Sequence, residues 1–314
     1  MVNFIAQRGI KMRYKWQLNI KGIFLIFSIV LPCSSYADNA RDWQNVPDDI
    51  NILFGYYENI NSNTSLDSSL PVDNASVDAD LYIIRYARSF DLGGHTAGIQ
   101  LIQPVAHLRA SLDGSPVLDD THTNQGMGDS QLALIYNLFG APALNSQDFR
   151  LWTPEMFLTS AIWVTAPTGD YDKTKALNIG GNRWVIKPEL AFGYPVGPFW
   201  VEVNPMVTFY QDNDDYLGSH HLAQRPLYAA EGHFSFTFNP ALWVSLDSTF
   251  SQGGETRIDG SLQDNKQQNV VLGASLGFML TPQFGGAVAY TDTTHEESGS
   301  PDISTWMFRM QYAW

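Results

Sequence analysis

The last nine residues of the chain place a large apolar side chain at every second position. These positions are Trp306, Phe308, Met310, Tyr312 and Trp314. Since successive side chains of a β-strand point to opposite faces, the spacing puts all five on one face of an extended segment. A sheet in water rarely leaves such a face bare. Lipid accepts it, with Trp and Tyr near the headgroups and the opposite face turned into a barrel lumen.

The same segment resembles the C-terminal strand of bacterial outer-membrane barrels. In those proteins the strand is recognised by the barrel-assembly machinery. The resemblance implies that Tyr312 and Trp314 belong to an assembly signal, and that the assembly machinery is a partner of this chain.

The first 37 residues have the parts of a secretory signal peptide. An apolar run from Gly22 to Leu31 is followed by Ser35-Tyr36-Ala37, which supplies small residues at the two positions that a signal peptidase reads. The run is too short to cross a bilayer of about 30 Å, which argues against a membrane anchor. We predict that residues 1–37 are removed after Ala37, and that 38–314 form one outer-membrane domain in a Gram-negative bacterium. The basic residues ahead of the run include Lys11, Arg13, Lys15 and Lys21.

The charge of the chain after such cleavage excludes some partners. The only cysteine, Cys33, lies in the predicted signal, so no disulfide or thiolate metal site is expected. The signal holds five of the 18 Lys and Arg residues and none of the 32 acidic ones, so 13 basic minus 32 acidic residues give a net charge of −19. Such an acidic chain is not expected to bind nucleic acid.

Twelve segments show period-two alternation or a strong β composition. A membrane strand tilted by about 45° needs roughly 9 to 11 residues, close to the length of these segments. In 183–194 the charged residues Arg183, Lys187 and Glu189 all fall on one face. The predicted strands are 49–57, 80–90, 95–103, 128–139, 155–165, 183–194, 199–210, 226–238, 241–250, 269–280, 283–291 and 303–314.

The predicted connections alternate between short and long. Outer-membrane barrels have this asymmetry, with tight periplasmic turns and extended external loops, whereas a soluble β-sandwich has no reason to sort its loops by length. We therefore predict an all-β fold, an antiparallel transmembrane β-barrel of about twelve strands. Short turns are expected at 91–94, 195–198, 239–240 and 281–282, with a longer turn at 140–153. Long loops are expected at 58–78, 106–127, 166–182, 211–225, 251–267 and 292–302.

Two proline residues interrupt this pattern. Pro188 and Pro205 lie inside predicted strands, where each removes one ladder hydrogen bond. They mark either bulges or misplaced strand boundaries, so the predicted strand number carries a margin of two.

Two stretches in the second half of the chain carry motifs. The first is Ala166-Pro-Thr-Gly-Asp-Tyr-Asp172, followed by Leu177-Asn-Ile-Gly-Gly-Asn-Arg-Trp184 and Lys187-Pro-Glu189. The second is Arg225-Pro-Leu-Tyr228 with Glu231-Gly-His233, then Leu242-Trp243 and Gly253-Gly-Glu-Thr256, and Gly126-Met-Gly-Asp129 is a fainter match. They resemble the outer-membrane family grouped under the meta-pathway of phenol degradation. The resemblance implies a transporter of small hydrophobic or aromatic compounds.

The first motif can also be interpreted from its residues alone. Its glycines allow positive φ, and its Asp and Asn side chains can hydrogen-bond to their own backbone in turns. The segment is therefore either a folded external loop or a loop that folds inward and narrows the lumen. Its candidate residues are Pro167, Thr168, Gly169, Asp170, Asn178, Gly180, Asn182 and Trp184.

Charged residues of both signs fall on the faces predicted to point inward. Inside a membrane such charges must be paired or hydrated, which predicts a hydrogen-bonded lumen. They either plug and rigidify the barrel or form a polar constriction that selects a small solute, and twelve strands would leave only a narrow pore. The candidates are Arg85, Arg183, Lys187, Glu189, Glu202, Asn204, Glu231, His233, Asp247 and Arg309.

His233 and Ser235 share a strand face and could in principle form a base and nucleophile pair. Outer-membrane phospholipases place such a pair near the external rim, whereas these residues lie close to a short turn, so we expect no enzyme activity.

We predict no metal site from the scattered histidines. The acidic loop residues either hold Ca²⁺ between lipopolysaccharide phosphates or are solvated, and we favour solvation.

The sequence thus predicts an outer-membrane channel for facilitated diffusion of small hydrophobic or aromatic compounds, without a cofactor. The expected partners are outer-membrane lipid, lipopolysaccharide and the solute. The alternatives are a structural or adhesive barrel that conducts nothing and, less favoured, an outer-membrane lipid hydrolase.

Overall fold

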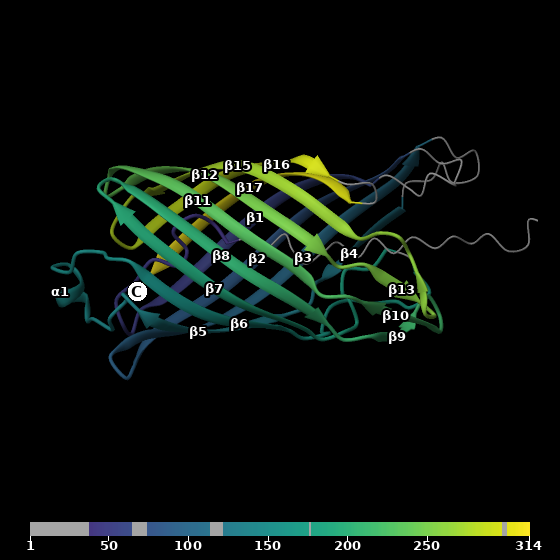
Figure 1. The fold of residues 1–314 in the computed structure, drawn as a ribbon, viewed down its shortest axis with the longest axis horizontal. Coiled ribbons are helices and arrows are strands. Elements are labelled where there is room, and N and C mark those ends of the chain that lie inside the picture. Colours follow the sequence, from purple (N-terminus) through teal and green to yellow (C-terminus); the bar gives the residue numbers. More distant parts are fainter. Residues whose placement is uncertain (1–37, 65–73, 114–121, 176, 297–299) are drawn as a thin grey trace, which may run out of the picture.

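The computed structural model describes residues 38–64, 74–113, 122–175, 177–296 and 300–314. The predicted signal peptide lies outside this part of the chain. Twelve antiparallel strands close into a barrel, which confirms the predicted fold (Figure 1). The barrel strands are β1 (Asn51–Thr64), β2 (Asn74–Leu92), β3 (His95–Asp113), β4 and β5 together (His122–Met127 and Gln131–Phe139), β6 (Phe157–Thr165), β7 (Val185–Val196), β8 (Phe199–Tyr210), β11 (Leu227–Asn239), β12 (Leu242–Gly253), β15 (Gln267–Met279), β16 (Phe284–Glu296) and β17 (Pro301–Ala313).

Pairing of the first and last strands closes the barrel. One edge of β1 pairs with β17, from Ile52 opposite Ala313 to Thr64 opposite Pro301. The other edge of β1 pairs with β2. β4 and β5 count as one interrupted strand because they pair in succession along β3. Closure leaves no edge strand exposed within the ring, which is what a sheet surrounded by hydrocarbon requires.

The alternation in the sequence becomes an inner and an outer face. Along β7 the exposed residues Ile186 and Leu190 alternate with the buried residues Glu189 and Ala191. The exposed face is apolar around the barrel, as expected for strands in contact with lipid. Its residues include Tyr82, Ile84, Leu101, Leu134, Ile162, Val203, Phe234, Leu246, Leu272, Leu276, Phe308 and Met310.

The short turns gather at one end of the barrel, the end at which the C-terminus lies (Figure 1). Gly93 and Gly94 have φ of 67° and 85°, a left-handed conformation that glycine adopts without strain. The longer turn carries the single described helix, α1 (Ser146–Phe149). The side chain of Asn145 caps this helix by accepting hydrogen bonds from the backbone N–H groups of Gln147 and Asp148. No helix in the described residues is long and apolar enough to cross a membrane.

The two prolines lie inside strands after all. The pairing of β7 with β8 keeps the same register on both sides of Pro188 and Pro205, from Ile186 opposite Phe209 to Phe192 opposite Val203. The ladder is therefore interrupted at the prolines without a bulge.

Several strands continue well beyond the predicted boundaries, including β4 and β16. β1, β2 and β3 extend into segments predicted as loops, because polar side chains bridge the strands there. The carboxylate of Asp80 accepts hydrogen bonds from Tyr57, Asn59 and Arg109 at 2.8–3.1 Å. The period of two continues in these extensions with buried apolar residues such as Ile60, Val77 and Leu108 on the inner face, and the polar contacts take the place of lipid-facing side chains on the outer face.

A second, four-stranded sheet lies at the long-loop end, in the ranges predicted as loops 211–225 and 251–267 (Figure 1). It comprises β9 (Asn213–Tyr216), β10 (His220–Gln224), β13 (Thr256–Ile258) and β14 (Ser261–Leu262). Ion pairs join its strands and neighbouring turns. Nδ1 of His221 lies 2.6 Å from Asp214, and the backbone N–H of His221 donates to Asp259 at 2.9 Å.

These pairs predict that the small sheet is firmest between about pH 4 and 6.5. The hydrogen bond to Asp214 raises the pKa of His221, so its contribution is complete below the ordinary histidine value and is lost as the pH rises through the raised pKa. The backbone hydrogen bond from His221 lowers the pKa of Asp259, so its contribution is lost only as the pH falls through that lowered value.

Hydrogen exchange of residues 211–225, corrected for intrinsic rates, should therefore be faster at alkaline pH than near pH 6. The change should disappear in His221→Gln. An equal change in that variant would show that another group controls the sheet.

Candidate functional site: the lumen and the segment that crosses it

The predicted inward residues line the interior of the barrel. Glu202 and Asn204 of β8 are each 1% exposed, and Glu189, Glu231, His233 and Arg309 are also buried, although their strand neighbours face outward. Lys187 and Glu189 form an ion pair at 3.3 Å. Asp247 and Arg85 take part in the ion pairs described below. Arg183 lies just before β7 at the long-loop end, where it hydrogen-bonds to Gln224 and stacks on Tyr210 at 4.7 Å.

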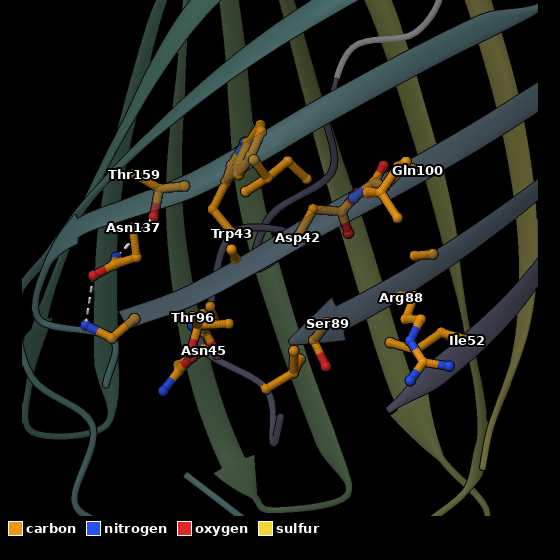
Figure 2. A pocket seen from close by; sticks show the side chains of 18 of the residues that line it. Asp42, Trp43, Asn45, Ile52, Arg88, Ser89, Thr96, Gln100, Asn137 and Thr159 are labelled. Carbon is orange, nitrogen blue, oxygen red and sulfur yellow. Dashed lines mark hydrogen bonds between the residues drawn. The ribbon is translucent and has the colours of Figure 1, made fainter. Parts of the chain in front are cut away.

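A feature that the sequence did not reveal is the segment from residue 38 to 50, here called the plug. It precedes β1, and its residues Asp42, Trp43 and Asn45 lie inside the ring of strands (Figures 1 and 2). Its side chains meet charged residues of several strands. Arg85 and Arg309 pair with the plug, whereas the other luminal ion pairs, such as Lys187–Glu189 and His233–Asp247, join wall residues to each other.

Arg41 binds one wall of the barrel. Its backbone N–H donates to Glu202 at 2.9 Å, and its guanidinium donates to the hydroxyls of Ser235 at 2.9 Å and Thr237 at 2.8 Å. The guanidinium also lies over the ring of Trp243 at 5.0 Å. Arg41 thereby joins the plug to β8, β11 and β12.

The next residue, Asp42, binds strands elsewhere in the ring. Its carboxylate lies 3.3 Å from Arg85 of β2 and is hydrogen-bonded to Arg309 of β17. Arg85 also donates to the hydroxyl of Tyr56 at 3.2 Å and lies over Phe54 at 5.1 Å. Two adjacent plug residues of opposite charge therefore tie together strands that are not neighbours in the sheet.

Two tryptophans make the centre of the lumen partly apolar. Trp43 of the plug and Trp163 of β6 meet edge to face, with ring centroids 6.3 Å apart. The indole of Trp43 donates to Asp38 at 3.1 Å, and that of Trp163 donates to Glu189 at 2.9 Å. The ammonium group of Lys187 lies over the Trp163 ring, 4.8 Å from its centroid, so a charged group contacts the apolar surface here.

A cavity of about 110 Å³ lies between the plug and the wall formed by β1, β2, β3, β5 and β6 (Figure 2). A cavity of about 150 Å³ with apolar walls is known to hold benzene, so this volume is close to that of a single aromatic ring. The apolar part of the lining includes Trp43, Ile52, Ala87, Ala97 and Ile135, and the polar part includes Gln100, Asn137 and Thr159.

His233 and Ser235 do not form a base and nucleophile pair. Nδ1 of His233 lies 2.8 Å from the carboxylate of Asp247, which also accepts hydrogen bonds from Ser245 at 2.7 Å and Ser275 at 2.8 Å. The hydroxyl of Ser235 instead accepts from Arg41. The geometry offers no activated nucleophile at this position.

The sequence also identifies the family. The family model described as Putative MetA-pathway of phenol degradation matches residues 59–302. The chain belongs to this family. No curated protein matches the sequence significantly.

Solved structures with similar folds are outer-membrane barrels. An outer membrane channel from Pseudomonas putida F1 is 21% identical with a TM-score of 0.76, over 88% of this chain and 100% of that one. The transport unit of the autotransporter AIDA-I from Escherichia coli is 9% identical with a TM-score of 0.53, over 89% and 94%. The translocator domain of NalP from Neisseria meningitidis is 7% identical with a TM-score of 0.51, over 85% and 89%. At these identities the likeness concerns the fold. The neighbours are a channel and two transport domains, not enzymes.

The first family motif and the segment Gly126–Asp129 meet in one hydrogen-bonded cluster at the break between β4 and β5. The carboxylate of Asp129 accepts from the backbone N–H groups of Gly169 and Gly181, both at 2.8 Å. The carboxylate of Asp170 accepts a hydrogen bond from the backbone N–H of Met127 at 2.8 Å. The hydroxyl of Thr168 accepts one from the backbone N–H of Ser130 at 2.9 Å.

Close approach explains the glycines of these motifs. A Cβ on Gly126 would lie 2.1 Å from the carboxylate of Asp170, and one on Gly180 would lie 2.8 Å from the backbone of Gly169. Leu177 and Ile179 pack against the buried apolar cluster, so the loop folds onto the interior. Among the other candidates, Asn178 accepts from the backbone of Asp172, Asn182 donates to Asn213, Pro167 lies in the preceding turn and Trp184 is exposed on the outer face.

The two aromatic residues of the predicted assembly signal lie on the outer face. Tyr312 and Trp314 are both exposed and stack with ring centroids 5.9 Å apart. The backbone of Trp314 exchanges two hydrogen bonds of 2.9 Å with Asn51, so the last residue also helps to close the barrel. Their role in assembly stays a prediction.

Proposed function

We propose that this protein is an outer-membrane channel through which small hydrophobic or aromatic compounds pass by facilitated diffusion, without ATP, cofactor or catalysis. The observation that carries the proposal is the ring-sized, largely apolar cavity between the plug and the barrel wall. Family membership supports an aromatic solute, and the similar Pseudomonas putida protein is described as a channel. The proposal includes export by the signal at residues 1–37, insertion by the assembly machinery, and contact with lipid and lipopolysaccharide.

Flux into liposomes tests this function. Vesicles containing the protein should take up a phenol or an alkanoate faster than empty vesicles. Ala97→Phe should slow the uptake of the aromatic compound, because Ala97 is 2% exposed and a phenyl group there would fill the cavity. Leu101→Phe is the matched control, since Leu101 lies on the same strand and faces outward.

A second candidate is a structural or adhesive barrel that conducts nothing. The plug favours it, because Arg41 and Asp42 tie the segment to the walls across the lumen. Absence of flux above empty vesicles for every solute tested would establish this alternative. Uptake that is equally fast in Ala97→Phe would instead show that solutes do not pass through the cavity.

A further inference from the structure

Three buried carboxylates converge inside the barrel. They belong to Asp38 of the plug, Glu189 of β7 and Glu231 of β11, and one oxygen of each lies within 4.8 Å of the others. All three residues are less than a tenth exposed. The three residues are far apart in the sequence, so the cluster could not be predicted from a motif.

The described side chains do not balance the charge of this cluster. Lys187 lies 3.3 Å from one oxygen of Glu189. His233 approaches Glu231 only to 3.9 Å, and its other ring nitrogen is bound to Asp247 at 2.8 Å. One lysine therefore faces three carboxylates, and the histidine is shared with a fourth.

Two oxygens of the cluster also lack a hydrogen-bond donor. They are Oε1 of Glu189 and Oε2 of Glu231, both shielded from solvent. Oε2 of Glu231 has Nε2 of His233 at 3.9 Å, beyond hydrogen-bonding distance, and Oε1 of Glu189 has no donor, which is unfavourable for buried anionic oxygens. The unmet demand points to a positively charged ligand that binds between the carboxylates.

Space for water lies beside one member of the cluster. A cavity of about 30 Å³, large enough for a water molecule, lies on the side of Asp38 that faces Glu58 and Arg85. Ca²⁺ takes about six to eight oxygen ligands in flexible geometry, from carboxylates, amide oxygens and water. The three carboxylates of the cluster would therefore leave part of the coordination shell to water.

We propose that Asp38, Glu189 and Glu231 bind a divalent cation, Ca²⁺, inside the lumen. The ion joins the start of the plug to β7 and β11, on strands other than those held by Asp42. The site is independent of the solute that the channel carries.

Terbium luminescence tests the site, because Tb³⁺ replaces Ca²⁺ and is excited by a nearby indole. Both Trp43 and Trp163 donate hydrogen bonds to carboxylates of the cluster, at 3.1 Å and 2.9 Å. The full chain, purified from membranes, should give sensitised Tb³⁺ emission that added Ca²⁺ abolishes. Glu189→Gln and Glu231→Gln should each weaken Ca²⁺ competition by at least about tenfold, since each removes a charged ligand.

Glu202→Gln is the matched control, because Glu202 is an equally buried luminal carboxylate that binds the plug outside the cluster. It should retain the emission. Compact migration of unheated protein in electrophoresis verifies that each variant is folded, and equilibrium dialysis with Ca²⁺ gives a readout independent of the tryptophans. Absence of emission and of Ca²⁺ binding in the folded wild type, or equal loss in Glu202→Gln, would overturn the proposal. The α-ammonium of a chain cut after Ala37 would then be the balancing charge.

Discussion

Asp42→Ala is expected to release the plug and raise the ion conductance of the barrel. Asp42 is the carboxylate partner of Arg85 and of Arg309, and both guanidinium groups are buried. Removing one member of a buried ion pair costs roughly 3–5 kcal/mol, because the remaining charge is left without compensation. Here two charges are left, so the bound position of the plug becomes less favourable than one in which water enters the lumen.

Single-channel recording in planar bilayers measures this effect directly. Asp49→Ala is the matched control, because Asp49 pairs with Arg88 at 3.2 Å in an exposed position, where the two side chains are 76% and 46% exposed. An exposed pair contributes at most about 1 kcal/mol, so this variant should conduct like the wild type. Equal conductance of Asp42→Ala and the wild type would show that the plug is held mainly by contacts other than this carboxylate.

The barrel itself could be predicted from the sequence because each strand carries its own signal. Lipid on one side and a polar lumen on the other impose a period of two that survives in a single segment, as Ile186, Glu189 and Leu190 show in β7. The short turns add a second local signal. Both depend on residues that are close in the chain, so neither requires knowledge of the tertiary structure.

The contents of the lumen could not be predicted in the same way. The sequence indicated that residues such as Arg85, Glu202 and Arg309 face inward, but not what they bind. The backbone of Arg41 reaches Glu202 across 161 positions, and Asp42 reaches Arg309 across 267. The plug has neither a helical nor a strand period, and a short polar segment before a first strand looks like an ordinary connection.

The extended ends of β1, β2 and β3 were missed for a related reason. Asn59 and Arg109 lie in ranges predicted as loops, because polar residues of this kind are typical of loops when they are considered singly. Their hydrogen bonds to Asp80 across the strands stabilise a sheet beyond the lipid-facing zone. Cross-strand pairing of this kind becomes visible only once the register is known.

The second large effect is expected when the hydrogen bonds between Asp129 and the loop 166–184 are removed. Asp129→Ala should detach the loop 166–184 from the break between β4 and β5. Two backbone N–H groups, those of Gly169 and Gly181, would lose their acceptor, at a cost of about 1–3 kcal/mol each where they remain shielded from water. Asp129→Asn should cost about half as much, because an amide offers one acceptor oxygen in place of two.

Hydrogen exchange of residues 166–184 together with solute flux distinguishes the two interpretations of this loop. Exchange should increase in the order wild type, Asp129→Asn, Asp129→Ala. If the loop narrows the lumen, as the packing of Leu177 and Ile179 against the interior suggests, flux should rise in the same order. If the loop is only a folded external segment, exchange rises while flux stays constant. Exchange that is unchanged in Asp129→Ala would contradict the structural role assigned to the carboxylate, because it would mean that the glycine backbones hold their positions without it.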